Sequence, residues 1–216
     1  MAVVHHAFRW PFSLAVRDEI RHLLAAWSAG DRASIAEQAL AAYATLRTRP
    51  DITFPFSLQD ADHVEAWLQP AHVTAATACF LVLARHFEPV PSLSATRDTN
   101  LYTVETTLPL LGFPAGQVRA AVHGRPFESL LEELAGPADP LPRGGPVGLA
   151  GWLPGREAVD LLARVEATVA VAASPGAGDD ARRALDKLRA DGSLDDLVRM
   201  LGSVTAPDWL VVRIAC

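Results

Sequence analysis

Hydrophobic side chains recur at helical spacing through positions 16 to 46 of the chain. They return every three or four residues, with polar residues between them, which is the period of an amphipathic α-helix. Gly30 interrupts the pattern, and Asp31 after it is a residue type that caps helix N-termini. Two helices joined by so short a turn form an antiparallel hairpin, and this is the first element expected. Its apolar positions are Val16, Ile20, Leu23, Leu24 and Trp27, then Ile35, Ala39, Leu40, Tyr43 and Leu46.

The segment from His72 to Phe87 is apolar on almost every side. Its central stretch, Val73 to Ala84, runs for twelve residues without a charge. A helix without a polar face belongs in the middle of a core, whereas a membrane span needs about 20 apolar residues. We therefore expect a buried central helix and no membrane segment. Just before it, the capping-box-like run from Ser57 to Asp60 predicts a further helix that ends before Pro70.

The pattern between Arg97 and Gly112 is mixed. Apolar residues keep a helical step from Leu101 to Leu111, while four threonines and Tyr102 favour a strand. We expect a helix here, followed by two short helices at 115–123 and 126–135, each closed by a glycine.

Residues 136–155 contain six glycines and five prolines, a composition typical of a linker. Trp152 is expected to pin this linker to the core. Beyond it, helical spacing predicts three more helices, the last opened by a capping box at Ser193. The apolar run from Trp209 to Ala215 predicts a buried strand, which can pair with residues 3–8 near the N-terminus.

These elements predict a mainly α fold: a compact, multi-helix, bundle-like domain with a small β pairing of the N- and C-terminal segments. Residues 1–135 are expected to form a helical main unit, and residues 136–155 a Gly/Pro-rich linker. Residues 156–216 supply the C-terminal helices and the terminal strand, which pack on the main unit. A chain of 216 residues can build such a core without a disulfide or a metal.

The composition narrows the choice of partner and compartment. A net charge of −6 without a basic stripe argues against nucleic-acid binding. Two cysteines cannot build a four-thiolate zinc site, and the N-terminus lacks the apolar core of a signal peptide. Every basic position except Lys187 is arginine, which together with many alanines is typical of a high-GC bacterial coding bias. We therefore expect a cytoplasmic bacterial protein with no membrane or nucleic-acid partner.

One group of residues is a candidate metal site. Asp60 and His63 are three positions apart, so they share one side of a helix, and together they can supply two ligands to zinc or iron. His72 is a nearby candidate for a further ligand. The stronger His-x-x-x-His signal is absent, and a solvated outer helix face accounts for the same residues. Both interpretations stay open.

Two other polar clusters are candidates for a ligand or partner site. One follows a proline-rich loop, a common place for functional groups, although its residue types also cap helices. The other lies near the N-terminus, where arginine and protonated histidine can bind carboxylate or phosphate, although terminal segments also form edge strands. The first cluster comprises Arg97, Asp98, Asn100 and Tyr102, and the second comprises His5, His6, Arg9 and Trp10.

Common catalytic motifs are missing from the sequence. It has no Gly-x-Ser-x-Gly elbow, and burial of Cys79 in an apolar run should leave its thiol inert. The run from Gly145 to Gly151 lacks the steps of a phosphate loop. Helix-turn-helix spacing around Gly124 is followed by glutamates that would face phosphates, so DNA binding is rejected.

The sequence therefore favours a non-catalytic binding or regulatory module that contacts another protein or a second copy of itself. Tryptophans such as Trp10, Trp67 and Trp152 would anchor such a contact if they were exposed. The alternative is an enzyme or carrier that depends on a metal or an organic cofactor, with a His/carboxylate site in the helical bundle. No particular cofactor is indicated. An immunity- or antitoxin-like partner protein also fits the size and the acidity.

Overall fold

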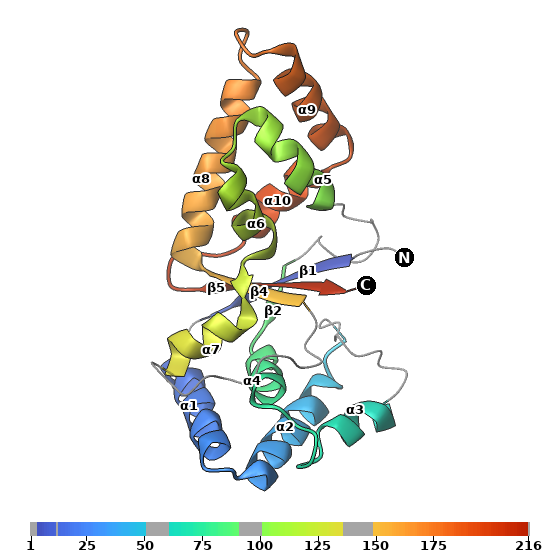
Figure 1. Cartoon of the computed structure of the whole chain (residues 1–216), viewed down its shortest axis with the longest axis vertical. Coiled ribbons are helices and arrows are strands. Elements are labelled where there is room, and N and C mark those ends of the chain that lie inside the picture. The colour runs from blue at the N-terminus through green and yellow to red at the C-terminus, as the bar shows by residue number, and fades with distance from the viewer. Residues whose placement is uncertain (1–3, 12, 51–60, 91–100, 136–148, 216) are drawn as a thin grey trace. The chain divides into compact units, whose positions relative to one another are not determined.

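The computed structural model describes residues 4–11, 13–50, 61–90, 101–135 and 149–215 of the chain (Figure 1). Within these residues the fold is mainly α, as expected, with a small antiparallel sheet that makes it more than a bundle. The helices are α1 (Leu14–Ser28), α2 (Arg32–Leu46), α3 (Ala61–Trp67), α4 (Ala75–Ala84), α5 (Leu101–Thr107), the 3₁₀ helix η1 (Leu108–Leu111), α6 (Ala115–His123), α7 (Phe127–Ala135), α8 (Gly155–Ala172), α9 (Asp179–Ala190) and α10 (Ser193–Leu201).

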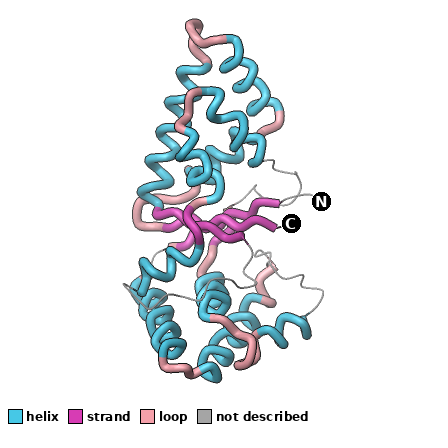
Figure 2. The backbone as a smooth tube through the Cα atoms, in the orientation of Figure 1, coloured by secondary structure: helices cyan, strands magenta, loops and turns pink. Residues whose placement is uncertain are grey.

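The strands of the described residues gather in one sheet (Figure 2). Their order across it is β2 (Glu88–Pro89), β1 (Val4–Trp10), β5 (Trp209–Ala215), β4 (Leu149–Pro154) and β3 (Arg125–Pro126). Strands β1 and β5 are neighbours, which confirms the expected pairing of the N- and C-terminal segments.

Strand β4 corrects part of the linker expected at 136–155. Residues 149–154 form this strand, and Gly155 already begins α8. Glycine is typical of loops, but Gly151 has a different role: a Cβ on it would lie 1.7 Å from the carbonyl oxygen of His123. The glycine therefore lets two backbones approach closely within a sheet. Residues 136–148 of the expected linker lie outside the described residues.

The chain forms two compact units, each assembled from separate segments of the sequence. Unit 1 comprises Met1–Arg9, Val90–Arg125 and Ala150–Cys216, and unit 2 comprises Trp10–Pro89 and Pro126–Leu149. These boundaries differ from those expected at 135 and 156. The expected division, in which residues 156–216 pack on the main unit, stays a prediction.

Unit 1 has a hydrophobic core to which residues before and after positions 136–155 contribute. Helices α9 and α10 pack on α5, and α9 also packs on η1. Burial of one apolar face in this core explains why α5 is a helix, as expected, despite its threonines. The core residues from the earlier segments of unit 1 include Leu101, Val104, Leu108, Phe113 and Val118. Those from its last segment, Ala150–Cys216, include Leu153, Val165, Leu185, Leu197 and Met200.

Unit 2 is built around α4, which confirms the expected central helix. All ten residues of α4 are buried, and α1, α2 and α7 pack on it. Phe80 on α4 makes edge-to-face contacts with Phe87 and Phe127, with ring centroids 5.9 and 5.3 Å away. Such geometry places the positive edge of one ring against the negative face of another.

Three N-terminal helix caps were expected from the sequence, at Asp31, Ser57 and Ser193, and the one at Ser57 lies outside the described residues. Asp31 Oδ1 accepts a hydrogen bond of 3.1 Å from the Ser34 N–H, so the cap of α2 is confirmed. At α10 the helix begins at Ser193 with Gly192 before it, and the expected capping box stays a prediction. The Ser193 N–H donates 2.9 Å to Asp191 Oδ1 across Gly192, whose φ is +73°. Left-handed φ favours glycine at this step.

Candidate functional site

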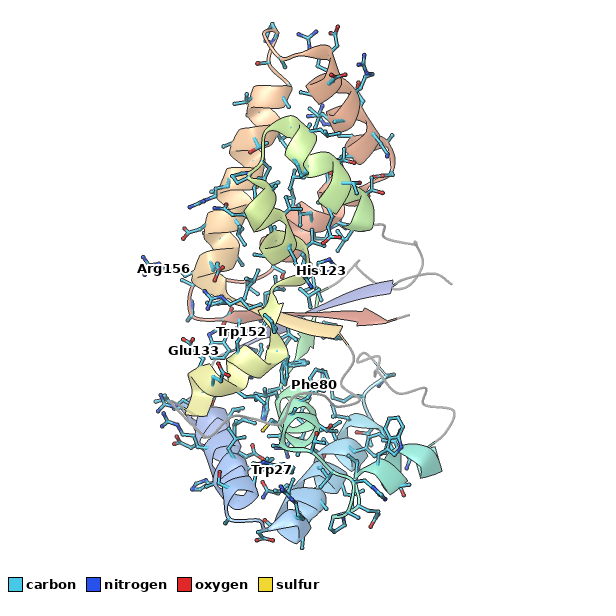
Figure 3. All side chains as sticks on the ribbon, in the orientation of Figure 1. Trp27, Phe80, His123, Glu133, Trp152 and Arg156 are labelled. Carbon is cyan, nitrogen blue, oxygen red and sulfur yellow. The ribbon has the colours of Figure 1, made fainter. Side chains whose placement is uncertain are left out.

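The densest polar network of unit 1 lies where α6 ends and β3 begins. His123 is the last residue of α6, Gly124 turns the chain with φ +73°, and Arg125 starts β3. A Cβ on Gly124 would lie 2.7 Å from the backbone nitrogen of Trp152 on β4. Glycine is therefore required twice here, for its φ and for its small size. Figure 3 labels His123, at the end of α6, and Trp152, on β4.

His123 ties α6 to α5. Its Nε2 lies 2.6 Å from Glu105 Oε1, and both side chains are less than one-third exposed. The Nδ1 atom on the other side of the ring is buried. This His–carboxylate pair therefore joins α5 and α6.

Arg125 makes the second contact of the network. Its Nη2 lies 2.5 Å from Glu157 Oε2 on α8, and its guanidinium carbon lies 5.5 Å from the centroid of the Trp152 ring. The Trp152 ring in turn packs on Trp209 of β5, with centroids 5.0 Å apart. An ion pair and a cation–π contact thus join β3, β4 and the start of α8.

Arg9, a candidate anion-binding residue, faces a carboxylate in the structure. Its Nη1 lies 3.7 Å from Asp208 Oδ2, and the Thr205 hydroxyl donates 3.0 Å to the same oxygen. The Asp208 carbonyl also accepts a hydrogen bond of 2.7 Å from the Gly155 N–H. The charge of Arg9 is therefore balanced within the protein, next to the first turn of α8.

The structure describes only some of the residues predicted for a site. Trp10 and Trp152 are 0% and 1% exposed, so both indoles belong to the core and neither offers an exposed anchor. Tyr102 lies on α5, one turn before Glu105. The side chains of Tyr102, His5 and His6 are not among those described, and Arg97, Asp98 and Asn100 lie outside the described residues.

The predicted metal site is described only in part. Asp60 lies outside the described residues, and the side chain of His63 on α3 does as well. His72 is exposed in the turn after α3. Among the residues that the structure does describe, no three His, Cys, Asp or Glu side chains are grouped so that they could hold a metal ion.

No family model, curated protein or solved structure matches this chain. Burial raises the pKa of the Cys79 thiol far above its usual range, so this cysteine is a neutral thiol rather than a nucleophilic thiolate at neutral pH. Over the described residues, none of the helices combines the length and the apolarity needed to cross a bilayer.

An exposed apolar face on α8 is the feature that sequence reasoning missed. It consists of Val159, Ala163, Ala167, Ala170 and Val171, which are all exposed and are here called the α8 surface. The buried side of the helix carries Ala158, Leu161, Val165 and Ala172. Helical spacing predicts the inner side, where Ala158 and Val165 are buried and Leu162 and Val169 pack on the core, but it does not predict the valines and alanines exposed on the outer side. Leu110 on η1, which packs against α8, is also exposed.

Proposed function

We propose that this protein is a non-catalytic binding or regulatory module of the bacterial cytosol. It acts by contacting another protein, or a second copy of itself, through the α8 surface. Apolar exposure is the observation that supports this most: Val171 is 67% exposed, and Val159 at the other end of the face is 43% exposed. Burying these side chains against a partner is favourable because it removes apolar area from water.

The α8 surface has the layout of an interface patch. Its apolar residues span about 18 Å, at 1.5 Å per residue, on one side of the helix. Arg164 and Glu166 flank it, Arg156 and Asp160 lie within the same arc of the helix, and all four are exposed. Figure 3 shows Arg156 pointing outward at the start of α8. A mixture of apolar and charged side chains is usual in a protein–protein contact.

In this proposal the polar network of unit 1 has a supporting role. Arg125 and Asp208 fix the first turn of α8 through Glu157 and Gly155. Arg164 Nη1 donates 2.9 Å to Gln117 Oε1 on α6, which holds the middle of the helix. A helix fixed at both places presents its outer face with little loss of conformational entropy on binding.

Site-specific photo-crosslinking in bacterial cells tests the proposal on the full chain. A benzophenone amino acid replaces Val171, and we expect irradiation to give a single adduct, with the mass of a partner or of a second copy. The same group in place of Lys187, an exposed residue of α9, is the matched control and should give none. A second substitution, Ala167→Glu, should abolish the Val171 adduct and leave the melting temperature unchanged.

Two outcomes would contradict the proposal. One is the absence of an adduct from Val171 and from Val159, or equal labelling from Lys187. The other comes from native mass spectrometry of the untagged protein, purified without chelator. A monomer that carries the extra mass of a metal or a small molecule would favour the cofactor-dependent enzyme instead.

A further inference from the structure

No further inference is drawn: the strongest candidate, the exposed apolar face of α8 together with Leu110 on the neighbouring η1, carries none because nothing in the described part of the structure shows what covers it.

Discussion

Gly151 sits at a point in unit 1 where no other residue fits. Its missing side chain leaves space for the carbonyl oxygen of His123, which a Cβ would meet at 1.7 Å, and for the Arg125 carbonyl oxygen at 3.2 Å. Both neighbours are backbone atoms, so they cannot move aside as a flexible side chain would. The pairing of β3 with β4 depends on this residue.

Replacing Gly151 with alanine should lower the free energy of unfolding by about 3 kcal/mol or more, because the added methyl forces the two backbones apart. Urea unfolding followed by circular dichroism measures the change. Gly116→Ala is the matched control: Gly116 lies in α6 with nothing within 4 Å of its Cβ position. That substitution should raise the stability by about 0.5–1 kcal/mol, since alanine favours a helix. Equal effects of the two substitutions would contradict the close approach at Gly151.

His86 should make unit 2 sensitive to acid. Burial, with Arg85 and Arg49 nearby, lowers the pKa of His86, and Glu19 only partly opposes this. The unfolded chain, with a histidine pKa of about 6.5, then binds the proton more tightly than the folded protein. Stability is therefore full above that pH and falls as the pH drops through the lowered pKa of the folded state.

The measurement is the free energy of unfolding in urea at several pH values between about 5 and 8. In His86→Gln the free energy of unfolding should fall less at low pH than in the wild type, since glutamine does not titrate. An NMR titration gives the pKa of His86 directly. A pKa of His86 above that of an unfolded histidine would contradict the expected direction of the shift. So would a variant that loses as much stability at low pH as the wild type.

At the scale of the elements, the sequence was a good guide wherever the pattern of hydrophobic residues was clear. The α1–α2 hairpin, the buried α4 and the terminal pairing of β1 with β5 were all predicted. Strand β4 was not, because Gly151 and Pro154 indicate a loop unless the opposing backbone is known. The network of Glu105, His123 and Arg125 was missed for a related reason: its contacts join residues 18 and 32 positions apart, which no helical spacing reports.

The two outer strands of the sheet share features that limit pairing with a further strand. Strands β2 and β3 stand at the ends of the strand order, and each is two residues long and contains a proline, Pro89 or Pro126. Proline lacks the N–H that a further strand would need, so short edges of this kind resist pairing with other chains.

The contact between His123 and Glu105 should contribute measurably to the docking of α5 on α6. A double-mutant cycle with His123→Ala and Glu105→Ala should give a coupling energy of about 0.5–2 kcal/mol, because both groups are largely buried and lie 2.6 Å apart. The Asp180–Arg183 pair on α9 is the control, since both of its side chains are exposed. Its coupling should stay below about 0.5 kcal/mol. A His123–Glu105 coupling as small as that of the control would show that the pair is incidental.

At the scale of the molecule, the core of unit 1 depends on segments far apart in the sequence. Leu108 and Val118 come from before residue 136, and Val165 and Leu197 come from after residue 155. Composition alone suggested that the glycine- and proline-rich stretch separates two parts. Only tertiary packing could show that both sides of it enter the same core.

Splitting the chain between residues 142 and 143 tests this sharing. Co-expressed as separate chains, residues 1–142 and 143–216 should purify as a 1:1 complex, because α5, η1 and α6 need α8, α9 and α10 to bury their apolar faces. In the fragment 1–142 alone, amides of residues 101–123 should lose their protection from hydrogen exchange, while those of α4 keep it. Two fragments that fold separately and do not associate would instead support independent domains.

The order of the strands also bears on how the protein is made. Strand β5 lies between β1 and β4 in the sheet, yet it is the last of the five to leave the ribosome. About 55 residues separate the end of β4 from the start of β5, and at roughly 5–20 residues per second their synthesis takes about 3–11 s. During that time β1 and β4 each have an edge without its partner, which is the state in which nascent chains pair with the wrong strand. A molecule whose outer edges are protected once the sheet has formed is thus most exposed to misassembly before β5 emerges, and a chaperone that shields nascent chains should increase its yield.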